Sequence, residues 1–152
     1  MSWKKFNIIL LAVLVVAECF LMPVRAAEDN SVFLSDIASE AVDTAKVVFL
    51  ENDLIPLTTG SVNCSVEAHT LATASEKFYL EAGEIVTINC SYTPSFASVD
   101  FGLISSSGVF SLLNVTGGSI NTGIRVNQYD SYTFAIRNNS ANTIRVTGYI
   151  TY

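Results

Sequence analysis

From Leu54 to Tyr152, apolar and polar side chains alternate in short runs that are separated by turn-forming residues. Alternation with a period of two is the pattern of an extended strand, because successive side chains point to opposite faces. The gaps between the runs are rich in Gly, Asn, Asp and Ser, which supply the backbone conformations of tight turns. The runs lie at residues 61–68, 72–80, 84–92, 97–105, 109–115, 119–126, 130–138 and 143–152.

About eight short strands, spaced eight to twelve residues apart, are typical of a sandwich or a barrel. One side of each run is apolar, as at Val99, Phe101 and Leu103, so each strand has a face to bury. A chain of about 100 residues is long enough for one two-sheet core. We therefore expect residues 54–152 to form an all-β domain. The predicted architecture is an antiparallel two-sheet β-sandwich, jelly-roll-like, whose last strand lies inside a sheet.

The N-terminal residues have the features of a secretory signal peptide. Lys4 and Lys5 precede an apolar run at residues 8–17, which at about 1.5 Å per residue spans only half of the ~30 Å hydrocarbon layer. Val24 and Ala26 occupy the −3 and −1 positions of a cleavage site after Ala26. We expect residues 1–26 to be removed, leaving a secreted or cell-surface protein without a membrane span. The alternative is an uncleaved membrane anchor.

Residues 27–53 form an acidic leader or linker that lacks the two-residue alternation. Its apolar residues recur at three- or four-residue spacing, which predicts a short helix or else a flexible segment. After cleavage at Ala26 the chain has thirteen acidic and five basic residues, a net charge of −8. Such a surface repels phosphate backbones, which argues against nucleic-acid binding. The recurring apolar residues are Leu34, Ile37, Ala41, Ala45 and Val48.

Cys64 and Cys90 are the two cysteines that follow the predicted cleavage site. An even number of cysteines in an exported domain suggests a disulfide, and only one pairing exists. Both lie at the apolar positions of their runs, so both thiols are expected to point into the core. We expect a Cys64–Cys90 disulfide, with two buried free thiols as the alternative.

The chain offers little for catalysis or metal binding. His69 is the single histidine, and no serine lies in a G-x-S-x-G motif, so a serine–histidine mechanism lacks its parts. The nearest groups of oxygen ligands are Glu28 with Asp29 and Asn127 with Asp130, which we interpret as solvated polar residues. We expect no enzyme activity, no metal and no cofactor. The one enzyme class that the sequence leaves open is a glycosidase with a pair of carboxylates, because the sequence does not show how far apart two carboxylates lie in space.

Several segments together resemble the bacterial pre-peptidase C-terminal (PPC) β-sandwich. Residues 77–88 (KFYLEAGEIVTI) are similar to its opening strand, A-G turn and second strand, and residues 99–104 with Ser107-Gly108 resemble a following strand and turn. Residues 130–136 and 144–152 are similar to its closing strands. The chain also resembles small exported proteins of Gram-positive bacteria. The resemblance implies an accessory, non-catalytic domain that in some relatives binds collagen or carbohydrate, and it transfers no site residue.

Aromatic residues at turns or at outward positions are the candidate binding residues. Tyr79, Phe110, Tyr129 and Tyr149, together with Phe96, could present a platform on which sugar rings stack, or could cap the ends of the sandwich. We therefore expect an exported, non-catalytic β-sandwich that binds an extracellular glycan or protein at the cell surface. The alternative is a secreted structural or matrix protein that self-associates through exposed edge strands.

Overall fold

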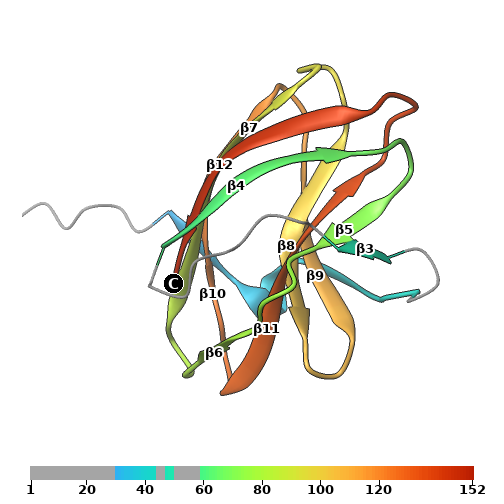
Figure 1. The fold of residues 1–152 in the computed structure, drawn as a ribbon. Helices are drawn as coiled ribbons and strands as arrows, with labels where there is room; N and C mark the ends of the chain where they lie inside the picture. Colours follow the sequence, from blue (N-terminus) through green and yellow to red (C-terminus); the bar gives the residue numbers. More distant parts are fainter. Residues whose placement is uncertain (1–29, 44–46, 50–58) are drawn as a thin grey trace, which may run out of the picture.

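A computed structural model describes residues 30–43, 47–49 and 59–152, which form two β-sheets packed against each other (Figure 1). The predicted signal peptide, residues 1–26, lies outside the described residues. No helix among the described residues has the length and apolar character needed to cross a membrane. The expectation of an all-β sandwich is confirmed.

The first sheet has five strands, and its central strands come from the middle and the end of the chain. All neighbours in it are antiparallel except β1, which runs parallel to β10. The final strand, β12, lies between two other strands, as expected for the closing run. The order across this five-stranded sheet is β1 (Ser31–Phe33), β10 (Ser119–Arg125), β7 (Ile85–Thr93), β12 (Ile144–Thr151) and β4 (Thr59–Val66).

The second sheet has seven strands. Its short strand β6 (Phe78–Leu80) pairs with β11 beyond the end of β5, because residues 74–77 interrupt the predicted run 72–80. The other predicted runs each form one strand, so the alternation located them well. The order across this seven-stranded sheet is β2 (Ala38–Ala41), β9 (Val109–Val115), β8 (Val99–Ser105), β11 (Asp130–Asn138), β5 (Leu71–Thr73) and β3 (Val47–Phe49).

The leader contributes strands to both sheets, so the fold has more strands than the eight expected. The predicted short helix is wrong for the described residues, which form β1, a 3-10 turn η1 (Leu34–Asp36) and β2 instead. A short isolated helix is marginal in water, whereas strand formation pairs this backbone with β10 and β9. Leu34 and Ile37 still contact the core, but from a largely extended chain.

The main core lies between the two sheets. It includes Ile88 and Ile150 from the five-stranded sheet and Phe101 and Phe134 from the seven-stranded sheet, all fully buried. A second, smaller cluster lies on the outer face of the seven-stranded sheet. It consists of Leu71, Phe110, Leu112 and Ala135, with Val42 and Ile104 packed against them.

The predicted Cys64–Cys90 disulfide is not formed, and both residues are free thiols. Both side chains contact the core, as the alternation indicated. However, Cys64 lies on β4 and Cys90 on β7, and β12 runs between these strands. Two strand spacings amount to about 9.6 Å, which exceeds the ~7 Å limit between Cα atoms that a disulfide can bridge.

Candidate functional site

Two of the predicted binding residues, Tyr79 and Tyr129, lie together on the surface. Their ring centroids are 6.5 Å apart and the ring planes are inclined by 23°, so the rings are stacked. Tyr79 is 68% exposed and Tyr129 is 62% exposed. Stacked aromatic rings usually stabilise a protein from a buried position, so two stacked rings that are both exposed form an unusual apolar surface.

Strand pairing holds Tyr79 in this position. β6 pairs with β11 so that Tyr79 lies opposite Ser131. Phe78 and Leu80 on either side of Tyr79 are buried in the main core, which forces the tyrosine to the outer face of the seven-stranded sheet.

The segment that carries Tyr129 is fixed at both ends by hydrogen bonds. The Gly83 amide donates to the Val126 carbonyl at 2.8 Å, so the start of the segment is bound to residues 81–84, the connection between β6 and β7. The buried Tyr132 hydroxyl donates to the Gln128 carbonyl at 3.3 Å. Tyr129 is therefore presented by a short connection that is anchored to the sandwich.

Asp130 lies directly after this connection and binds the next loop. Its carboxylate accepts hydrogen bonds from the Ser131 amide at 2.7 Å and from the Ser106 amide at 3.4 Å. Hydrogen bonds, first of all from the Ser106 side chain, lower the pKa of Asp130 below its ordinary value. The carboxylate therefore stays ionised and ties the Tyr129 segment to the β8–β9 turn.

A pocket of about 320 Å³ opens on the same outer face, and although neither tyrosine lines it, two of its lining residues lie close to them. Thr133 in its lining is two residues along β11 from Ser131, and Lys77 is two residues from Tyr79, about 7 Å along an extended chain. The remaining polar lining consists of the hydroxyl residues Thr73, Ser75, Ser105 and Ser106.

The pocket also has an apolar wall, formed by Val42 and Ile104. Both residues belong to the small outer cluster, so this wall is continuous with packed side chains. Hydroxyl groups on one side and apolar groups on the other are what a sugar ring, with its polar edge and apolar face, requires of a binding site.

Phe110 is not an exposed ring, so the expectation that it forms part of a platform is wrong. It does lie on the outer face, but it is fully buried, because the leader covers it. Glu40 on β2 pairs with Phe110 in the strand register, and the Arg137 guanidinium carbon lies 5.7 Å from the ring centroid.

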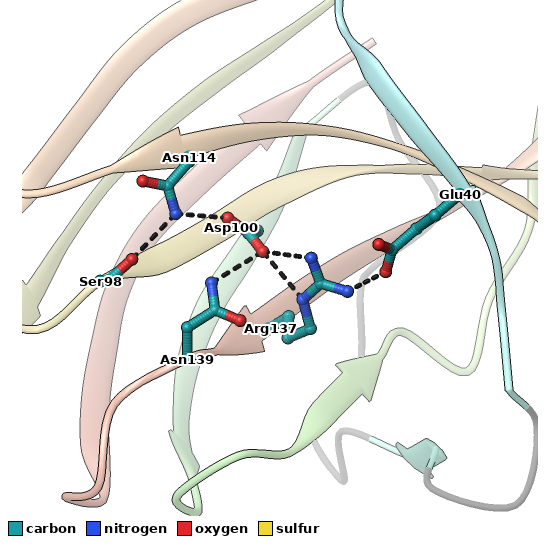
Figure 2. A network of polar contacts seen from close by, with 6 residues as sticks. All are labelled: Glu40, Ser98, Asp100, Asn114, Arg137 and Asn139. Atoms are coloured by element: carbon teal, nitrogen blue, oxygen red, sulfur yellow. Dashed lines mark hydrogen bonds and ion pairs between the residues drawn. The ribbon is translucent and has the colours of Figure 1, made fainter.

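Arg137 belongs to a polar network on this face (Figure 2). Its Nε donates to Asp100 Oδ2 at 2.8 Å, and it also forms an ion pair with Glu40. Asn114 donates to Asp100 Oδ1 at 2.6 Å, and Asn139 donates to Asp100 Oδ2 at 2.8 Å.

Asp100 is 1% exposed, and both of its carboxylate oxygens accept hydrogen bonds. Among the described residues, no buried side-chain nitrogen or oxygen lacks a partner. A buried carboxylate that is held by an arginine and two asparagines has its charge and hydrogen bonds compensated by neighbouring residues. The network therefore serves the structure.

The structure does not bring Tyr149 or Phe96 to the tyrosine pair. Tyr149 is 45% exposed and lies on β12, on the outer face of the opposite sheet, where its hydroxyl accepts a hydrogen bond from Asn89 at 3.2 Å. Phe96 is 74% exposed in the turn between β7 and β8.

The described residues contain no group of three or more His, Cys, Asp or Glu side chains that could hold a metal ion. His69 lies in the turn between β4 and β5 with a positive φ of 55° and is exposed. Comparison with known proteins gives no match, either to a protein-family model or to a curated protein.

The hydroxyl residues of the pocket were not among the predicted site residues. Thr133 and Ser131 lie at the outward positions of their run, and this was the available signal. The sequence could not show that the outward positions of β11 lie beside residues 73–77 and 105–106, because strand pairing alone makes them neighbours.

Proposed function

We propose that this protein is an exported, non-catalytic β-sandwich that binds an extracellular glycan on the outer face of its seven-stranded sheet. The observation that carries the proposal is the stacked and exposed pair Tyr79 and Tyr129 beside a hydroxyl-lined pocket. The rings offer apolar faces to the C–H face of a sugar, and Thr133, Ser105 and Ser106 offer hydrogen-bond partners to its hydroxyl groups.

The strand order supports a jelly-roll assignment for this fold. Within the two sheets, the order β10-β7-β12-β4 faces the order β9-β8-β11-β5, and β6 follows β5 along the same side of β11. From β4 to β12 the chain crosses from one sheet to the other at each step, except that β6 follows β5 and β9 follows β8 within the seven-stranded sheet. This order is compatible with two Greek keys, an arrangement that lectin domains also use. The resemblance to PPC sandwiches points in the same direction, since that family includes accessory domains that bind carbohydrate.

Export is part of the proposal and is supported by the N-terminal sequence. The basic start, the short apolar run and the small residues at 24 and 26 have the order of a secretory signal. A protein exported in this way is in contact with extracellular glycans, which is the class of partner that we propose.

The test is binding to a panel of neutral and acidic polysaccharides, measured by affinity electrophoresis and titration calorimetry. Tyr79→Ala and Tyr129→Ala are each expected to weaken binding about tenfold, equivalent to about 1.4 kcal/mol. The matched control is Tyr149→Ala, which removes an exposed tyrosine from the opposite sheet and is expected to leave affinity unchanged.

Two results would contradict the proposal. The first is no binding to any polysaccharide of the panel by the folded protein. The second is binding that Tyr149→Ala reduces as much as Tyr79→Ala does, because the interaction would then not be located on the tyrosine pair.

A further inference from the structure

Lys77 is a basic residue that the fold does not use for its own contacts. Among the described residues, every arginine donates a hydrogen bond to another residue: Arg125 to Gly83, Arg137 to Asp100 and Arg145 to Asn63. Lys77 is exposed, and its side chain forms no hydrogen bond or ion pair with any described residue. Its ammonium group, which has three donor hydrogens, is therefore available to a partner from outside the chain.

Lys77 lines the pocket on the outer face of the seven-stranded sheet, and no acidic side chain is found among the described residues that line it. Ser75 and Thr133 contribute hydroxyl groups to the same pocket, and neither hydroxyl is hydrogen-bonded to another described residue. An ammonium group together with free hydroxyl groups is a suitable donor set for an anionic oxygen.

The carboxylates near the pocket do not neutralise this charge. The Asp130 carboxylate is held by backbone amides, that of Ser106 among them at 3.4 Å. Asp43 and Glu76 are exposed, and in the described part of the chain none of these three carboxylates forms an ion pair with Lys77. An anion that enters the pocket therefore meets a lysine whose charge is not already paired.

We propose that the pocket takes an acidic sugar, whose carboxylate or sulfate group pairs with Lys77. The inference rests on the proposed glycan function and specifies the class of sugar. Lys77 lies two residues from Tyr79, about 7 Å along an extended chain. A short glycan that stacks on the tyrosine therefore reaches the ammonium group with a neighbouring sugar.

The overall negative charge of the protein does not prevent this contact. The chain has a formal charge of −6. At physiological ionic strength the Debye length is about 8 Å, so acidic residues farther from the pocket are largely screened. An ion pair that the pocket partly encloses is screened much less.

The test is titration calorimetry at about 0.15 M salt with two pairs of polymers, each pair sharing one backbone. Polygalacturonate and its methyl ester test the carboxylate, and dextran sulfate and dextran test the sulfate. The parent protein is expected to bind the charged member of at least one pair about fivefold more tightly than the neutral member. Lys77→Gln should abolish this preference, and Lys77→Arg should retain it.

The matched control is Arg145→Gln, which removes one positive charge from an exposed position of the opposite sheet. It is expected to leave the preference unchanged. Circular dichroism and thermal melting of all three variants separate a loss of binding from a loss of folding.

Equal binding of the charged and neutral members by the parent protein overturns this inference. It leaves the proposed function intact when Tyr79→Ala weakens binding to both members. A preference that Lys77→Gln retains, or that Arg145→Gln abolishes to the same extent, also overturns the inference, because the preference then does not originate at the pocket. Absence of binding to all four polymers overturns the inference together with the proposed function.

Discussion

A buried carboxylate on the outer face of a sheet must be compensated by its neighbours. Asp100 achieves this with Arg137 and two asparagines, which approach from β11, β9 and the turn after β11. Because charged hydrogen bonds to a buried carboxylate are strong, the network fixes the register of β8 against both neighbouring strands. Arg137 also reaches Glu40 and thereby connects this register to β2 of the leader.

Replacing Asp100 with alanine should destabilise the fold strongly. The change leaves the Arg137 guanidinium half-buried and removes the acceptor of Asn114 and Asn139, and breaking a buried pair in this way costs about 3–5 kcal/mol. Urea unfolding followed by circular dichroism measures the loss. Glu76→Ala, which removes a carboxylate at an exposed position, is the control and should shift the midpoint little. Equal midpoints for both variants would show that the network contributes nothing.

The network also shows which property of single residues could not be predicted from the sequence, namely their burial. Alternation places Asp100, between the apolar Val99 and Phe101, and Phe110 on the outer sides of their strands, but an outward position does not by itself mean exposure to solvent. Both residues are buried, because Arg137 and Glu40 of the leader, which lie 27 to 70 residues away from them in the sequence, fold over them. Local patterns carry no information about such long-range cover.

At the scale of elements, the order of strands decides whether the two cysteines can form a disulfide. Cys64 and Cys90 share the core side of one sheet, yet β12 separates them. Alternation predicts the face of the sheet on which a side chain lies, but not the order of strands in the sheet. It could not show that β12 separates the two cysteines, and the predicted disulfide is therefore wrong. Burial raises the pKa of Cys64 to about 11 and that of Cys90 to about 12.

These shifts predict that stability declines at alkaline pH. The unfolded chain ionises its thiols near pH 9, whereas the folded chain keeps its protons until about pH 11 or higher. Between these values the unfolded state binds fewer protons, so the free energy of unfolding falls as pH rises. Urea midpoints at pH 8 and pH 10 measure the slope, and the double variant Cys64→Ala/Cys90→Ala should have a smaller one. An equal slope in both proteins, or a Cys64–Cys90 disulfide in peptide mass mapping, would contradict free thiols.

At the scale of the whole molecule, the leader is what joins the two sheets at one side of the sandwich. Within residues 31–41 the chain pairs with β10 in one sheet, makes the turn η1, and pairs with β9 in the other. The Val42 amide then donates to the Gly108 carbonyl at 3.0 Å, and its side chain packs on the small outer cluster. The leader was predictable as a distinct segment by its charge, but its strands have too few residues to show alternation.

This arrangement predicts that a fragment of residues 54–152 is less stable than the protein that includes the leader. Without β2 and Val42, the buried ring of Phe110 and the side chain of Leu112 become exposed to water, at a cost of about 1.5–3 kcal/mol for each side chain. The fragment should therefore unfold at a clearly lower urea concentration and bind a hydrophobic dye more strongly. Glu40→Gln in the longer protein is the control for charge. It weakens only the exposed ion pair with Arg137, which is worth at most about 1 kcal/mol. If the fragment and the longer protein unfold at the same urea concentration, the leader does not stabilise the sandwich, and the burial of Phe110 does not depend on it.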